Sequence, residues 1–287
     1  MRYDMAIIGT GPAGISAALT AAVRRLNFLL IGSGKLSEKI SRAERIENYP
    51  GLPSVSGEAM AAVFRQQLAD AGVAVTEGRV NAVYPMGDYF ALQAGEAVIE
   101  ADTVVLATGI VTDRPLPGED AFLGRGVSIC ATCDGALYRG RRIAVVGAGK
   151  EAAAEADYLA GIAGEVLYFP VSGPEPDRRD NLTIIREKPE IIEGRLKADT
   201  LVTDRQRYDV DGIFVLRDAV RPERLVPGLV TDGPHVKTDL TMGTSVPGLF
   251  ACGDITGRPY QYIKAAGQGN TAALSAVAYL AARKHRQ

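Results

Sequence analysis

Two cysteines, Cys130 and Cys133, are separated by two residues near the middle of the chain, and Asp134 follows the second. Thiols at this spacing can form a small disulfide loop, supply half of a metal site, or be buried without a chemical role. A structural zinc site needs two further ligands. The only other thiol and imidazole side chains are Cys252, His235 and His285. The spacing therefore favours a redox pair, and no metal is expected.

Asp134 stands beside one thiol, where a carboxylate could donate or accept a proton. A carboxylate at such a place can also cap a helix, and the two roles are compatible. Cys252 ends an apolar run, so we expect it to be a core residue without a redox role.

A glycine-rich turn lies near the start of the chain, where Gly9-Thr10-Gly11-Pro12-Ala13-Gly14 follows one apolar run and precedes an Ala-rich segment. In a dinucleotide-binding fingerprint, Gly9 permits the tight turn and Gly11 lets the backbone approach a pyrophosphate. Gly14 lets helix and strand pack closely. The helix that begins at Pro12 and Ala13 then offers its free N–H groups to the anion. This context predicts dinucleotide binding rather than a plain glycine turn.

An acidic residue is missing after the second strand, where Gly32-Ser33-Gly34 stands and a ribose hydroxyl would need a carboxylate. Its absence argues against a simple NAD site and leaves FAD. Ala107-Thr108-Gly109 and Gly253-Asp254 each follow an apolar strand and suit a flavin site. Small residues at a strand end allow close approach of the cofactor, and Asp254 could accept a hydrogen bond from the ribityl chain. Alone, an Asp in this position is usually a helix cap.

The elements that position these residues form two βαβ units. The first comprises strand 4–8, helix 13–23 and strand 27–31, and the second comprises strand 142–146, helix 152–160 and strand 165–169. We therefore expect an α/β protein with two Rossmann-like domains of the FAD/NAD(P)-binding type. Further expected elements are a proline-rich boundary at 113–118, a loop at 170–177, a hairpin within 191–216 and a closing helix at 269–283.

Composition agrees with a globular protein. The chain has 287 residues, of which 47% are hydrophobic and 23% are charged, with a formal net charge of −2. This near-zero charge gives no support for nucleic-acid binding. Three cysteines are too few for a disulfide-stapled secreted scaffold. No apolar run reaches the ~18 residues of a membrane span, and the first residues do not resemble a signal peptide. We expect a cytoplasmic protein.

Taken together, these motifs resemble the low-molecular-weight thioredoxin reductase family. The matching segments, in family order, are Gly9 to Gly14, Glu47-Asn48-Tyr49-Pro50-Gly51, Ala107-Thr108-Gly109, Cys130-Ala131-Thr132-Cys133-Asp134, Val146-Gly147-Ala148-Gly149, and Gly248 to Asp254 with Gln261 and Ala266-Gly267. The resemblance implies an FAD-binding domain built from 1–113 and 245–287. A truncated central domain, 114–244, would be inserted into it and carry the disulfide. It also implies a homodimer.

The resemblance further implies roles for individual residues. Cys133 would face the flavin, Cys130 would attack thioredoxin, and Asp134 would be the acid/base. Cofactor-binding positions would be Gly9, Gly11, Pro12, Ala13, Gly14, Gly32, Ser33, Lys39, Ile40, Asn48, Val80, Ala107, Thr108, Gly109, Asp254, Gln261 and Tyr262. Lys39 replaces the family's usual Gln and Tyr262 its usual Ala, so the flavin face is expected to differ.

Three departures concern the second glycine turn. Relatives that use NADPH carry arginines after the second strand of this unit, whereas here that strand ends Leu167-Tyr168-Phe169-Pro170-Val171. Arg178 and Arg179 come only later. Lys150-Glu151 replaces a small polar pair, and a carboxylate near a helix N-terminus would repel a pyrophosphate, although both side chains could simply be solvated. The segment 169–212 is also shorter than in those relatives.

With these departures, the sequence resembles the ferredoxin-dependent flavin thioredoxin reductases, a branch of the family that does not use pyridine nucleotides. That resemblance implies electron flow from reduced ferredoxin through FAD to the Cys130–Cys133 pair and on to thioredoxin. Arg139, Arg141 and Arg142 could form a basic surface for an acidic ferredoxin, or an ordinary solvated strand end. Two alternatives remain. One is a thioredoxin reductase that uses NADPH or NADH at a divergent site, and the other is a flavin-bound disulfide sensor.

Overall fold

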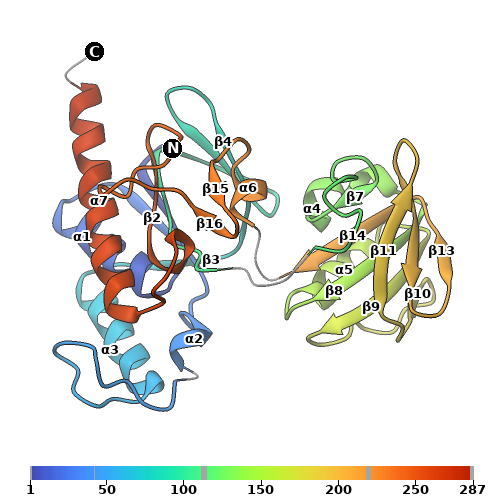
Figure 1. Ribbon diagram of the computed structural model, residues 1–287, viewed down its shortest axis with the longest axis horizontal. Coiled ribbons are helices and arrows are strands. Elements are labelled where there is room, and N and C mark those ends of the chain that lie inside the picture. Colours follow the sequence, from blue (N-terminus) through green and yellow to red (C-terminus); the bar gives the residue numbers. More distant parts are fainter. Residues whose placement is uncertain (1, 42, 111–114, 218–220, 285–287) are drawn as a thin grey trace. The chain divides into compact units, whose positions relative to one another are not determined.

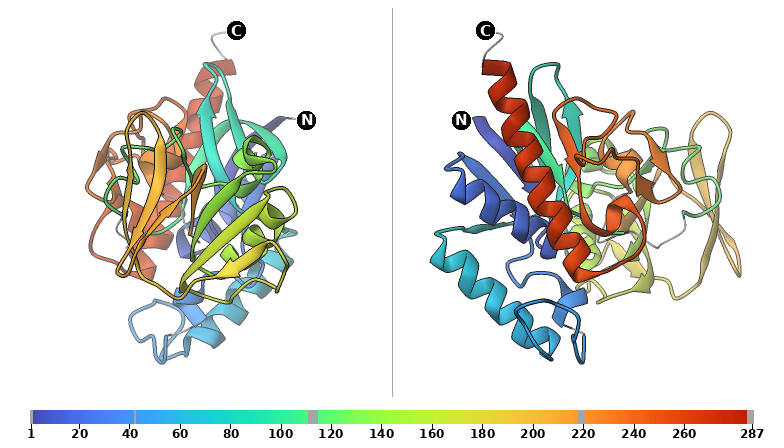
Figure 2. Two further views of the ribbon diagram at one scale, coloured as in Figure 1. Left: turned by 90° about the vertical axis from the view of Figure 1, so that its right-hand side faces the viewer. Right: turned by 60° about the vertical axis from the view of Figure 1, so that its left-hand side comes forward.

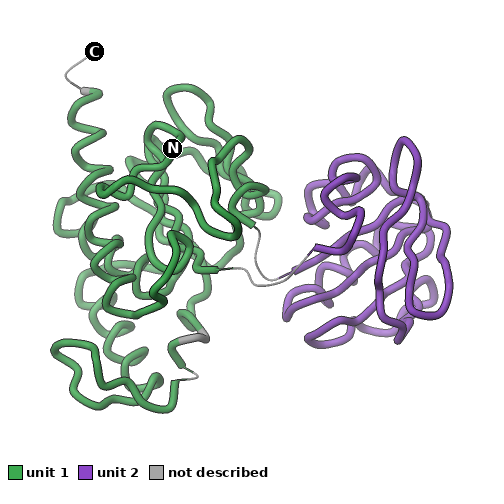
Figure 3. The backbone as a smooth tube through the Cα atoms, viewed as in Figure 1, with its two compact units in different colours: residues 1–112, 221–287 green, residues 113–220 purple. Residues whose placement is uncertain are grey.

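The computed structural model describes residues 2–41, 43–110, 115–217 and 221–284, apart from the side chains of Glu38, Lys39 and Lys284. The chain forms two compact units (Figure 3). Unit 1 comprises residues 1–112 and 221–287, and unit 2 comprises residues 113–220. Unit 2 is one continuous segment between the two segments of unit 1, and the chain returns to unit 1 at 221, earlier than the expected 245.

This earlier return has a packing reason. Residues 221–244 contain the short helix α6 (Pro222–Leu225) and the hairpin β15 (Thr231–Asp232) and β16 (His235–Val236). Met242 belongs to the hydrophobic core of unit 1, and its carbonyl accepts a hydrogen bond of 3.0 Å from the N–H of Ala251. Sequence patterning alone gives no signal for such long-range partners.

Unit 1 is built on a seven-stranded sheet in the order β3-β2-β1-β6-β5-β4, with β17 also pairing to β6. The strands are β1 (Arg2–Ile8), β2 (Phe28–Gly32), β3 (Val75–Glu77), β4 (Val80–Pro85), β5 (Phe90–Ala94), β6 (Ala97–Leu106) and β17 (Leu249–Ala251). β1, β2, β3, β6 and β17 pair in parallel, whereas β4 and β5 form an antiparallel extension. The parallel strands therefore end along one edge, which is where dinucleotide folds bind ligands.

Unit 1 also contains helices that pack on this sheet or on one another. They are α1 (Pro12–Val23), α2 (Glu38–Ser41), α3 (Gly57–Asp70) and α7 (Tyr262–Lys284), with a 3-10 turn, η2 (Gly253–Thr256). α7 lies alongside α1 (Figures 1 and 2). The small residues of α1 let this helix pack closely against both the sheet and α7. A Cβ added at Gly269 of α7 would lie 2.0 Å from the backbone oxygen of Ala13. The closing helix starts at Tyr262, earlier than the predicted 269, and Gly269 within it makes this close contact.

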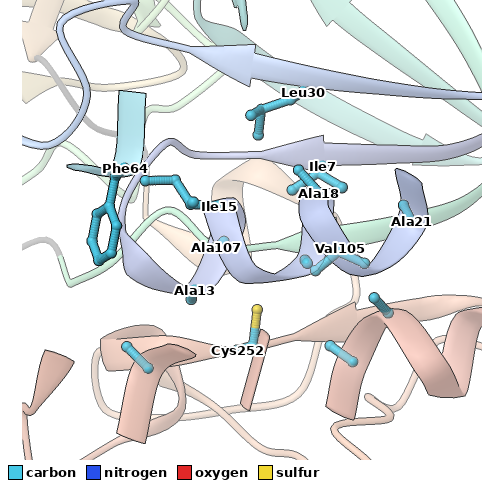
Figure 4. Packing of buried hydrophobic residues seen from close by; sticks show 14 of the residues in the cluster. Ile7, Ala13, Ile15, Ala18, Ala21, Leu30, Phe64, Val105, Ala107 and Cys252 are labelled. Atoms are coloured by element: carbon cyan, nitrogen blue, oxygen red, sulfur yellow. The ribbon is translucent and has the colours of Figure 1, made fainter. Parts of the chain in front are cut away.

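The core of unit 1 lies around α1. Figure 4 shows Ile15 and Ala18 of this helix together with Ile7, Leu30 and Val105 from the sheet and with Cys252, all in one cluster. Cys252 is fully buried, as expected of a core residue. Burial raises the pKa of its thiol to about 12. It is therefore a neutral thiol at physiological pH.

Unit 2 has a five-stranded parallel sheet in the order β10-β9-β8-β14-β7 and an antiparallel β11-β12-β13 sheet. Its strands are β7 (Val127–Ser128), β8 (Arg142–Ala148), β9 (Glu165–Ser172), β10 (Leu182–Ile184), β11 (Pro189–Gly194), β12 (Ala198–Thr203), β13 (Arg207–Asp209) and β14 (Gly212–Arg217). Its helices are α4 (Ala131–Asp134), η1 (Gly135–Tyr138) and α5 (Ala152–Ala160). β12 and β13 confirm the predicted hairpin.

Alternation along β8 builds two cores in unit 2. Ile143 and Val145 pack on the side of α5, whereas Ala144 and Val146 pack on the side of the antiparallel sheet. The α/β class and the two Rossmann-like units are thus confirmed. Among the described residues, no helix is both long enough and apolar enough to cross a membrane.

Candidate active site

The predicted cysteine pair is a disulfide in unit 2, between Cys130 and Cys133. Cys130 precedes α4 as its N-cap, and its sulfur accepts a hydrogen bond of 3.1 Å from the backbone N–H of Cys133. This places both sulfurs at the start of a helical turn. Cys133 is exposed, whereas Cys130 is only 6% exposed. Cys133 is therefore the more accessible of the two residues.

Asp134 ends α4 and makes no capping bond to the following 3-10 turn. Its Oδ2 instead lies 2.7 Å from the hydroxyl of Ser128. The same hydroxyl accepts a 3.1 Å hydrogen bond from the backbone N–H of Cys130. Ser128 therefore links the carboxylate to the backbone of the first cysteine. The sequence does not predict a role for this serine. It ends the short strand β7, and only the folded structure shows that β7 lies beside the disulfide.

The glycine turn of unit 1 has the packing that the fingerprint requires. A Cβ at Gly9 would lie 2.3 Å from the backbone oxygen of Ala107, and one at Gly14 would lie 1.8 Å from that of Gly9. At Gly11, by contrast, the nearest atom would be the Cβ of Ser37, at 3.9 Å. The turn is closed on its strand side and open over Gly11. This opening is where a pyrophosphate can approach the backbone.

Helix α1 begins directly at this opening. Gly11 is the N-cap of this helix, and Pro12 occupies its first helical position. No side chain makes a capping hydrogen bond there. Free N–H groups and the positive end of the helix dipole therefore face the open turn. The cradle fits the pyrophosphate of FAD.

Two further predicted segments meet this turn. Gly253 precedes Asp254 in η2, and a Cβ at Gly253 would lie 2.9 Å from that of Ala13. The N–H of Cys252 donates to the backbone oxygen of Leu106 at 2.9 Å, which places η2 beside the start of Ala107-Thr108-Gly109. The three segments that the sequence predicts to contact FAD are therefore adjacent in unit 1.

Other predicted cofactor residues lie at the same end of unit 1. Asn48 donates from its side-chain amide to Oε1 of Gln261 at 2.8 Å. Gln261 directly precedes Tyr262, whose pKa is raised by burial and by the charge of Asp254. The carbonyl of Ser33, next to Gly32, accepts a 3.0 Å bond from the hydroxyl of Thr10.

Three predicted positions are less directly placed. Val80 begins β4, two residues after Gly78, whose N–H donates to the oxygen of Gly32 at 3.3 Å. Ile40 is fully buried in the core of unit 1. The side chain of Lys39 lies outside the described residues.

The second glycine turn, Gly147-Ala148-Gly149 in unit 2, is built differently. In unit 1, pairing between β1 and β2 stops at the first glycine, where the N–H of Gly9 donates to Ile31 at 2.8 Å. In unit 2, β8 and β9 continue to pair through Ala148 and Ser172. The N–H of Gly149, the counterpart of Gly11, then donates to the oxygen of Ser172 at 3.0 Å.

The loop after β9 also covers the second turn. A Cβ at Gly173 would lie 2.1 Å from the oxygen of Gly149, so backbone packs on backbone. Tyr168 is fully buried, and its hydroxyl would lie 2.1 Å from a Cβ at Gly147. The place where a nucleotide would contact this turn is filled by the chain.

One cation near the second turn is already paired with a carboxylate. Arg179 pairs with Asp157 of α5, at 3.3 Å between Nε and Oδ1. Glu151 is exposed immediately before α5, as the solvated alternative predicted, and leaves a carboxylate at the helix N-terminus.

An open FAD cradle in one Rossmann-type unit and a two-cysteine disulfide in another define an FAD-dependent disulfide oxidoreductase. The family model for pyridine nucleotide-disulphide oxidoreductases matches residues 3–269, and the chain belongs to this family.

Individual relatives refine this assignment. Thioredoxin reductase from Bacillus subtilis (strain 168) is 30% identical over 301 residues, covering 97% of this chain and 95% of the relative. Glucosaminate ammonia-lyase from Pseudomonas fluorescens is 32% identical over 304 residues, covering 96% and 94%. The crystal structure of a ferredoxin-flavin thioredoxin reductase from Clostridium acetobutylicum superposes with a TM-score of 0.90 at 43% identity, covering 99% of each chain. The chain is a thioredoxin reductase homologue and a flavoprotein.

Proposed function

We propose that this protein is a thioredoxin reductase that takes electrons from reduced ferredoxin and makes no use of NADPH. The observation that carries the choice of donor is the bond between the N–H of Gly149 and the oxygen of Ser172. It consumes the backbone donor that a nucleotide pyrophosphate would need in unit 2. The similarity to a ferredoxin-flavin thioredoxin reductase supports the same donor.

The FAD cradle of unit 1 binds and orients the cofactor. The open backbone at Gly11 and the N-terminus of α1 would hold its pyrophosphate, and Asp254 would accept a hydrogen bond from its ribityl chain. Bound FAD would supply the conversion between single-electron and two-electron transfer.

The disulfide of unit 2 carries the thiol chemistry. Two electrons and two protons open the Cys130–Cys133 bond and give two thiols. Cys133, which is exposed, would be the sulfur that faces the flavin, and Cys130 would be the interchange thiol. Asp134 would transfer the proton at Cys130, held by the hydroxyl of Ser128.

Thioredoxin reduction then follows by exchange. The thiolate of Cys130 attacks one sulfur of the thioredoxin disulfide, and the other thioredoxin sulfur leaves as a thiol after protonation. The thiolate of Cys133 next attacks Cys130 in this mixed disulfide. Reduced thioredoxin is released, and the Cys130–Cys133 bond re-forms.

A reconstituted assay tests this function. Thioredoxin, the holoenzyme and an insulin reporter are mixed anaerobically with either photoreduced ferredoxin or NADPH. Insulin reduction with ferredoxin alone is the expected result. Turnover with NADPH alone would identify a pyridine-nucleotide enzyme, and flavin reduction without any thioredoxin turnover would identify a disulfide sensor.

A further inference from the structure

The FAD cradle lacks one expected part in the sequence. Dinucleotide folds hold the adenosine ribose with an acidic residue that follows the second strand. In this chain β2 ends at Gly32, and Ser33 and Gly34 follow. None of these three residues has a carboxylate.

A carboxylate reaches this position from the neighbouring strand. Glu77 ends β3, and its partner across the parallel pair is Gly32. Its Oε2 accepts a hydrogen bond of 2.7 Å from the backbone N–H of Gly34. A Cβ at Gly34 would lie 2.6 Å from the same oxygen. The glycine therefore leaves the space that the carboxylate occupies.

The turn that Glu77 contacts belongs to the FAD cradle. The hydroxyl of Thr10 donates to the carbonyl of Ser33 at 3.0 Å. A Cβ at Gly32 would lie 2.9 Å from a side-chain carbon of Thr10. Thr10 lies between Gly9 and Gly11, so the 32–34 turn packs directly on the pyrophosphate-binding turn. In this fold the adenosine ribose lies next to the pyrophosphate, over the end of β2.

The second carboxylate oxygen of Glu77 is available. Glu77 is exposed, and the described part of the chain gives it no bond other than that from Gly34. An ionised carboxylate has about four acceptor sites. Oε1 can therefore accept hydrogen bonds from a vicinal diol while Oε2 holds the turn.

We propose that Glu77 binds the ribose diol of the adenosine half of FAD and so replaces, from β3, the acidic residue absent after β2. The proposal concerns FAD binding and is independent of the electron donor. Its chemistry is recognition of two neighbouring hydroxyls by one charged acceptor.

The test is a binding cycle with the full-length protein. FAD and an FAD analogue without hydroxyls on its adenosine ribose are exchanged into the parent and into Glu77→Gln, and dissociation constants are measured by flavin fluorescence on dilution. A glutamine can still accept the Gly34 N–H through its amide oxygen. Glu96→Gln is the matched control. Glu96 is exposed and lies next to Gly95 in the turn between β5 and β6.

We expect the parent and the control to prefer FAD over the analogue by about 10-fold or more, since charged hydrogen bonds are the stronger ones. Glu77→Gln should lose most of this preference and bind FAD correspondingly more weakly. An unchanged preference in Glu77→Gln would overturn the proposal. Equal weakening of FAD and analogue would also overturn it, because Glu77 would then only support the turn.

Discussion

The backbone N–H of Gly149 donates to the oxygen of Ser172 at 3.0 Å, whereas its counterpart Gly11 in unit 1 is left open. One chain thus contains the same turn in two states. The open copy keeps free N–H groups of the kind that suit a pyrophosphate, and in the other copy the N–H of Gly149 is already hydrogen-bonded within the chain. We attribute the difference to two extra residues of pairing between β8 and β9.

Gly173→Ala tests how closely this loop packs. Gly173 has φ +93°, and an added Cβ would meet the oxygen of Gly149 at 2.1 Å. Gly140→Ala is the control, since its φ is +68° but no atom lies within 4 Å of an added Cβ. Denaturant unfolding should show a loss of about 3 kcal/mol for Gly173→Ala against about 1 kcal/mol for Gly140→Ala. Equal losses would mean that the loop does not cover the turn.

Ser128→Ala tests the link between serine and acid. It removes the 2.7 Å bond to Asp134, and we expect kcat for thioredoxin reduction to fall about 10-fold. Ser128→Thr, which keeps the hydroxyl, should recover most of the rate. If Ser128 acts through Asp134, Ser128→Ala should cost little more in an Asp134→Asn background. Additive losses would contradict this assignment.

The two cysteine roles can be separated by trapping. With Cys133→Ser, Cys130 remains free to attack thioredoxin, and a stable mixed disulfide should accumulate because the second thiol is missing. Cys130→Ser should trap far less. Mass spectrometry of the isolated adducts identifies the linked cysteine. Preferential trapping through Cys133, the more exposed sulfur in unit 2, would reverse the proposed roles.

Cys252 gives a prediction for alkaline pH. Its pKa is raised by burial from 9.0 to about 12. Below pH 9 both the folded and the unfolded thiol are protonated. Between these values only the unfolded thiol ionises, so the free energy of unfolding should fall by about 1.4 kcal/mol per pH unit from this group. Cys252→Ala, compared by denaturant unfolding, should show a shallower decline, and identical slopes would refute the shift.

Local chemistry explains what could be predicted. The Gly9–Gly14 turn, the Cys130–Cys133 pair and the β12–β13 hairpin each depend on neighbouring residues, so their patterns are visible in the chain. The missing arginines after β9 were also visible. Their absence could not reveal that Ser172 and Gly173 pack against the second glycine turn, where a nucleotide would otherwise contact it. That contact depends on the register between β8 and β9.

Long-range contacts explain the rest. Ser128 reaches Asp134 only because β7 lies beside the disulfide, and Glu77 reaches the turn after β2 only because β3 pairs with β2. The return of the chain at 221 depends on core contacts made by Met242. Each of these is a consequence of packing between segments that are distant in sequence.

Anaerobic stopped-flow reduction of the bound flavin tests the choice of electron donor most directly. The holoenzyme is mixed with excess reduced ferredoxin or with excess NADPH, and bleaching of the flavin absorbance is followed. We predict rapid bleaching by ferredoxin and at least about 100-fold slower bleaching by NADPH, because the lost phosphate contacts are charged hydrogen bonds. Rapid bleaching by NADPH would contradict the account.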